Sequence, residues 1–142
     1  AESLVEDFME IRQRLDPNAT TGLDELTQEI IMFRRVRLAK PDIHPVMATL
    51  SRRAPNDPAI ARHILPIKAY WHEKLTEMIR KGGQDGSLRA DLDPEPAARL
   101  FTWSLIFLGS PEQADLDFPK HATELLRLFA AGPVPSLEGH LK

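Results

Sequence analysis

Cysteine is absent from the 142-residue chain, and no apolar run approaches the roughly 20 residues that a membrane-spanning helix needs. The first absence excludes disulfides, thiol nucleophiles and thiolate metal sites. The second excludes a membrane-spanning helix, and the acidic residues near the N-terminus are unlike the basic start of a signal peptide. We therefore expect a cytoplasmic protein with no membrane partner.

Positive charge is scarce as well, since 18 Lys and Arg face 21 Asp and Glu for a formal net charge of −3. A domain that grips nucleic acid by itself usually presents a basic face, so this chain alone is not expected to bind DNA. Its 42% hydrophobic and 27% charged residues are ordinary for a soluble domain. The length is sufficient for one domain with a sizeable core.

Motifs for metal binding and catalysis are also missing. The pair His72–Glu73 begins like a zinc-protease motif, but Thr76 stands where the second histidine is required. His63 lies nine residues before His72, on the opposite side of the same predicted helix. No order of Ser, His, Asp and Lys indicates a nucleophilic triad. The expectation is a protein without metal, cofactor or enzymatic activity.

The chain is rich in helical periodicity. Apolar residues recur at helical spacing in six segments, which proline and glycine clusters separate: 2–15, 23–39, 42–53, 58–82, 94–109 and 118–131. No segment alternates like a strand. The sequence predicts a single all-α helical-bundle domain of about six helices over residues 1–142, with a flexible tail at 132–142.

The polar stretch between the fourth and fifth segments predicts a turn. The helix before it is expected to end at Gly82–Gly83 and to kink or restart near Arg62–Leu65, because Pro66 removes one backbone hydrogen bond. The next helix is expected to begin with Asp93 as N-cap and Pro94 as its first residue.

The predicted helix 94–109 is apolar on nearly every side, with only Thr102 and Ser104 interrupting it after Arg99. A helix that is apolar all round must be covered all round. We expect its own core on one side and a second subunit on the other, although enclosure by the helices of one chain is an alternative. The residues predicted at a dimer interface are Leu100, Trp103, Phe107, Leu108, Leu125, Leu126 and Phe129.

Aromatic and methionine side chains lie on helices that must pack together. They are either ordinary core or the wall of a ligand cavity, in which a few polar groups orient a largely apolar ligand. The candidate lining is Met32, Phe33, His44, Met47, Ile67, Tyr70, Trp71 and Thr102. A basic run nearby, with Arg34, Arg35, Arg37 and Lys40, is either an anion site or a solvated helix end.

One stretch resembles a known family. The turn Gly83-x-x-Gly86-x-Leu88-Arg89-x-Asp91-Leu92-Asp93-Pro94, followed by an apolar helix ending in Gly109, resembles the C-terminal domain of TetR-type transcriptional regulators. The resemblance implies an effector-binding domain that forms a homodimer through its last two long helices. It also implies that segment 2–15 is a connecting helix, and that a repressor of this type binds DNA through an N-terminal helix-turn-helix domain missing from these residues.

Two other hypotheses remain open. One is an enzyme built on a helical bundle, with Tyr70, His44 or His72 as acid or base. The other is a helical interaction module whose segment 94–109 binds a different protein. Symmetric self-association would separate the regulator hypothesis from the interaction module.

Overall fold

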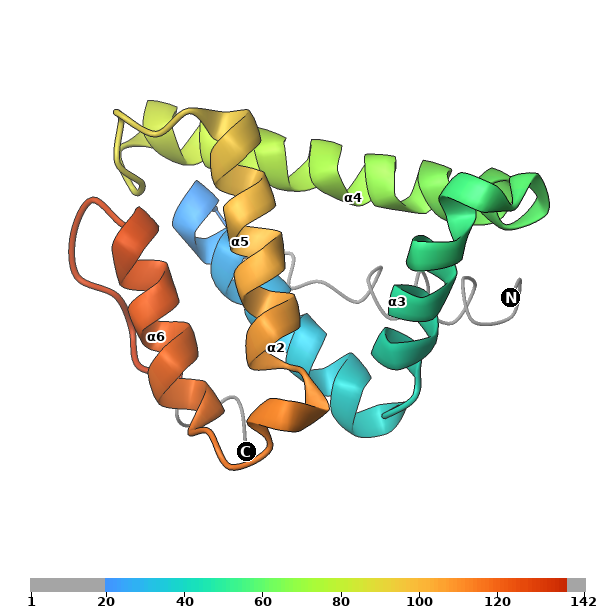
Figure 1. The fold of residues 1–142 in the computed structure, drawn as a ribbon. Helices are drawn as coiled ribbons and strands as arrows, with labels where there is room; N and C mark the ends of the chain where they lie inside the picture. The colour runs from blue at the N-terminus through green and yellow to red at the C-terminus, as the bar shows by residue number, and fades with distance from the viewer. Residues whose placement is uncertain (1–19, 138–142) are drawn as a thin grey trace.

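The computed structural model describes residues 20–137, which form five α-helices and two short 3-10 turns (Figure 1). The helices are α2 (Gly22–Ala39), α3 (Ile43–Arg53), α4 (Pro58–Asp85), α5 (Pro94–Leu108) and α6 (Phe118–Phe129), and the turns are η1 (Ala54–Asn56) and η2 (Pro111–Gln113). The all-α prediction is confirmed. The predicted connecting helix 2–15 lies outside the described residues, as do residues 138–142 of the predicted tail.

The long helix α4 runs along one edge of the molecule (Figure 1). Its C-terminal half packs against α2 and α5, with α6 beside α5, whereas α3 descends from its N-terminal end on the other side. The main core lies among α2, α4, α5 and α6. Its fully buried centre includes Leu26, Ile30, Leu75, Phe101, Leu105 and Leu126.

The first turn of α2 is fixed by side-chain hydrogen bonds. The Thr21 hydroxyl accepts from the Asp24 amide at 3.0 Å, and the Asp24 carboxylate accepts from the Thr21 amide at 3.2 Å, which is a capping box. Asp85 Oδ2 at the end of α4 accepts from the Gly22 amide at 2.9 Å. Burial alone would raise the pKa of Asp85, but hydrogen bonds from Ser87 and Gly22 outweigh it and lower the pKa.

The predicted end of α4 at Gly82–Gly83 is wrong, because the helix continues to Asp85. The helix ends instead at Gly86, whose φ of 82° lies in the left-handed region that glycine adopts without a Cβ clash. Pro66 lies inside α4, and the helix continues through it as one element rather than restarting.

Helix α5 begins at the predicted residue, Pro94. Asp93 is the N-cap, yet its side chain makes no capping hydrogen bond. Pro94 and Pro96 have no N–H, so Glu95 supplies the single amide donor among the first three helical positions. Glu95 also pairs with Arg99 one turn later, at 3.5 Å on the exposed surface.

The chain after α6 returns to the core. Sequence predicted a flexible tail from residue 132, but Leu137 is fully buried and Val134 packs against the same core. The described residues also contain one isolated antiparallel bridge, between Leu88 after α4 and Ala130 after α6. Beside it the Arg89 amide donates to the Phe129 carbonyl at 2.9 Å.

Candidate functional site

Helix α5 has one face inside the molecule and one outside. Ala97, Ala98, Phe101 and Leu105 are buried against the core. The opposite face exposes four large apolar side chains, namely Leu100, Trp103, Ile106 and Phe107. Trp103 is the largest of them, and 61% of its surface is exposed. The described part of the chain therefore covers only one side of this helix.

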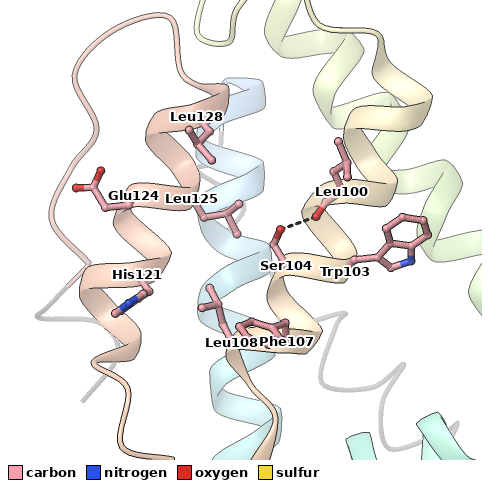
Figure 2. A pocket seen from close by; sticks show the side chains of 9 residues that line it. All are labelled: Leu100, Trp103, Ser104, Phe107, Leu108, His121, Glu124, Leu125 and Leu128. Carbon is pink, nitrogen blue, oxygen red and sulfur yellow. Dashed lines mark hydrogen bonds between the residues drawn. The ribbon is translucent and has the colours of Figure 1, made fainter. Parts of the chain in front are cut away.

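Helix α6 extends the exposed apolar surface. Leu128 is 65% exposed, and an open groove of about 470 Å³ separates α6 from α5. Figure 2 shows Leu125 and Leu128 projecting from α6 toward α5, whereas Trp103 projects from the other side of α5. The Ser104 hydroxyl donates to the Leu100 carbonyl at 2.7 Å, so its polarity is used within its own helix. We call Leu100, Trp103, Ile106, Phe107 and Leu128 the outer face.

The structure divides the predicted interface residues into two groups. Leu100, Trp103 and Phe107 are exposed, whereas Leu108 is half-buried and Leu125 is only 6% exposed, although both of these leucines line the groove. Leu126 and Phe129 point into the core instead: Leu126 is fully buried, and the Phe129 ring meets Phe101 edge-on with centroids 5.5 Å apart. A fully buried side chain cannot touch a partner, which removes Leu126 from the predicted interface.

Sequence reasoning missed Ile106 and Leu128. Leu125 and Leu128 are three residues apart and lie along one line of α6, yet Leu125 is buried and Leu128 is exposed. Spacing alone does not say which part of this line the rest of the chain covers. That depends on the packing of α6 against α2 and α5.

A second region lies on the inner sides of α2, α3 and α4. Val36 of α2 and Ile43 of α3 are buried together, with Met47 of α3 and Trp71 of α4 packed against them. We call these four residues the inner cluster. Trp71 also packs against the main core, so it links the two apolar regions.

The inner cluster contacts a buried carboxylate. Glu29 is only 2% exposed, and its Oε2 accepts a hydrogen bond from Trp71 Nε1 at 3.2 Å. A hydrogen bond to a charged acceptor is stronger than one between neutral groups. It also offsets part of the cost of burying the carboxylate. Sequence reasoning did not single out Glu29. Its position three residues after Leu26 and four before Phe33 places it on the buried stripe, which was the available signal.

Phe33 and His44 form a stacked pair beside the inner cluster. Their ring centroids are 4.4 Å apart at 26°, and Phe33 also stacks on Phe118 at 6.4 Å. Burial lowers the pKa of His44, a hydrogen bond to the Phe33 carbonyl opposes this, and the charge of Arg37 lowers it further. His44 is therefore held toward its neutral form, and its Nε2 is buried without a hydrogen-bond partner.

The remaining candidate pocket residues are not all brought together. Met32 is buried and Ile67 is half-buried on the same two helices, α2 and α4. Tyr70 is 43% exposed and lies under the Lys74 ammonium, 5.5 Å from its ring, so it faces solvent. Thr102 lies on α5, whose main contacts are with α4 and α6. Phe33 with His44, and Met47 with Trp71, are the parts of the predicted lining that meet.

Within residues 20–137, no group of three or more His, Asp or Glu side chains could hold a metal ion. None of the described helices is both long enough and apolar enough to cross a membrane. In comparisons with known proteins, no family model, no curated protein and no solved structure matched the chain.

Proposed function

We propose that this chain is the effector-binding and homodimerisation domain of a TetR-type transcriptional repressor. The observation that carries the proposal is the outer face, an apolar surface that α5 and α6 present to solvent. The turn over residues 83–94 and the order of the helices support the same function. In this proposal a helix-turn-helix domain outside residues 1–142 contacts DNA.

The outer face is costly to leave in water. With 61% of its surface exposed, Trp103 presents about 150 Å², on the basis that a tryptophan buries up to about 250 Å². At about 25 cal/mol per Å², covering this side chain contributes up to about 4 kcal/mol for each subunit. A twofold axis would place the same patch of both subunits together, so that α5 and α6 of each form a four-helix contact.

Effector binding is assigned to the interior of α2, α3 and α4. The inner cluster offers apolar contacts, and Glu29, Trp71 and His44 offer polar atoms beside it. A ligand shifts an equilibrium only if it binds two arrangements of the protein with different affinity. The element expected to respond is the connecting segment 2–15, which lies outside the described residues.

Sedimentation velocity tests the proposal with one variant and a matched control. The wild type should sediment as a dimer at micromolar concentration, and Trp103→Glu should sediment as a monomer with an unchanged helical circular dichroism spectrum. Leu65→Glu places the same charge at a leucine of α4 that is 52% exposed, and this variant should remain a dimer. A strictly monomeric wild type would contradict the proposal and favour the interaction-module hypothesis.

A further inference from the structure

Two arginines in the C-terminal half of α2 reach the same place in the fold. Arg34 and Arg37 are three residues apart and therefore lie on one side of the helix, where both are half-buried. The Arg34 guanidinium lies 4.9 Å above the ring of Phe118, at the start of α6. Arg37 Nη1 lies at the end of α5, only 2.8 Å from where a Cβ on Gly109 would stand. The two side chains thus flank the connection between α5 and α6.

Within residues 20–137, no carboxylate neutralises the charges of this pair. None of the ion pairs among the described residues includes Arg34 or Arg37. Arg34 Nε and Arg37 Nη1 are both buried with no hydrogen-bond partner. Burial lowers the pKa of Arg37, the positive charge of Arg34 lowers it further, and no carboxylate opposes either effect. A buried donor without an acceptor is unfavourable, so an anionic group beside these two arginines would be stabilised.

Two purely structural explanations do not account for the buried donors of both arginines. A solvated helix end explains Arg35, which is exposed, but not two neighbours with buried donors. The negative end of the α5 dipole attracts Arg37. However, the Leu105 and Phe107 carbonyls at that end already accept from the amides of residues 109 and 110, and the charge of Arg34 still lowers the pKa of Arg37.

We propose that Arg34 and Arg37 bind an oxyanion, the carboxylate or phosphate group of a small molecule, where α2 meets the α5–α6 connection. Guanidinium groups match both anions through paired N–H donors. The Phe33 ring, stacked on His44, adds an apolar wall beside them, so the ligand class is an anionic group on an apolar body. The inference rests on the proposed effector-binding function and names its ligand class.

Thermal unfolding of the 142-residue chain tests for the site with benzoate and inorganic phosphate as probes. At about ten times its Kd, a bound anion should raise Tm by roughly 5 °C. Sodium chloride at matched ionic strength should not. A response to benzoate alone assigns a carboxylate, a response to phosphate alone assigns a phosphate, and a response to both assigns their shared chemistry. Shifts no larger than those in sodium chloride overturn the proposal.

Titration calorimetry of three variants assigns the binding to the pair. Arg34→Gln and Arg37→Gln should each weaken binding of the responding anion at least about tenfold, since each removes charged hydrogen bonds. Arg35→Gln removes the same charge from the exposed side of α2 and should bind like the wild type. Equal binding by all three variants overturns the proposal.

Stability without ligand supplies a readout that a purely structural arginine would not give. Arg37→Gln removes an unneutralised charge, so its Tm without anion should equal or exceed that of the wild type. A lower Tm, together with unchanged binding, would show that Arg37 has a structural role. Sedimentation of the same samples separates the two proposals: a dimer that ignores anions contradicts this site alone, and a monomer that binds them contradicts the proposed function alone.

Discussion

Two adjacent glycines of α4 should respond in opposite ways to the same substitution. A Cβ on Gly82 would stand 2.3 Å from both Cγ and Cδ1 of Leu88. Leu88 is fully buried and its main chain is held in the bridge to Ala130, so it cannot withdraw. A Cβ on Gly83 would meet nothing closer than 4.0 Å. The two positions are adjacent in the same helix and differ in what a Cβ would meet, which makes each the control for the other.

The expected magnitudes follow from these distances. Overpacking at Gly82 costs about 3 kcal/mol, at the upper end of the usual range, and the better helix propensity of alanine returns about 1 kcal/mol. Gly82→Ala should therefore lower the free energy of unfolding by about 2 kcal/mol. Gly83→Ala should raise it by about 0.5–1 kcal/mol. With an unfolding entropy of roughly 2.1 cal/mol/K per residue over 142 residues, the two variants should differ in Tm by about 10 °C.

Thermal and urea unfolding followed by circular dichroism provide the measurement. Both variants should keep the wild-type m-value, since neither changes the surface that unfolding exposes. If Gly82→Ala proved as stable as Gly83→Ala, the close approach of Leu88 to α4 would be refuted. The same result would remove the packing reason for a glycine at this position.

Three further outcomes are expected. Leu126→Ala should cost about 2–5 kcal/mol in urea unfolding because the side chain is fully buried, whereas Leu128→Ala should weaken self-association in sedimentation equilibrium instead. Trp71→Phe removes the donor to the buried Glu29 carboxylate and should lower the free energy of unfolding in urea by roughly 1.5–3 kcal/mol. Hydrogen bonds lower the folded pKa of Asp85 although burial opposes them, so its stabilisation is complete above the ordinary value of 3.8 and is lost as pH falls through the folded pKa. Asp85→Asn should flatten this acid limb in urea midpoints measured between about pH 3 and pH 6, and an unchanged limb would contradict the assignment.

Helix type and most boundaries could be predicted because their causes are local. Asp57 accepts from the amides of Ala59 and Ile60, and Pro58 follows it as the first helical residue, so these local residues fix the start of α4 at the predicted position 58. The exposure of one side of α5 could also be predicted, because its own residues leave no polar face. The end of α4 could not, since Gly82 remains helical to admit Leu88, a contact made only in the folded chain.

The site was predictable only in part, because periodicity shows which residues share a stripe and not what covers it. Leu126 and Leu128 are both leucines of α6, and only the packing of neighbouring helices decides that one is buried and the other exposed. Tyr70 was predicted in the pocket lining from its helical spacing, but it faces solvent because none of the described helices covers it. The basic run of α2 was visible in the sequence, but the burial of two of its arginines at the α5–α6 connection is a property of the fold.

The bridge between Leu88 and Ala130 joins the segment after α4 to the segment after α6. Arg89 donates to Phe129, and the Ala131 amide donates to the Ser87 carbonyl at 3.0 Å, so the ends of α4 and α6 are attached by their main chains. A lengthwise displacement of α4 therefore pulls on α6. A molecule that moved α4 away from α2 would therefore also shift α6, which carries Leu128. The rates of amide hydrogen exchange at Arg89 and Ala131 would change together with this shift.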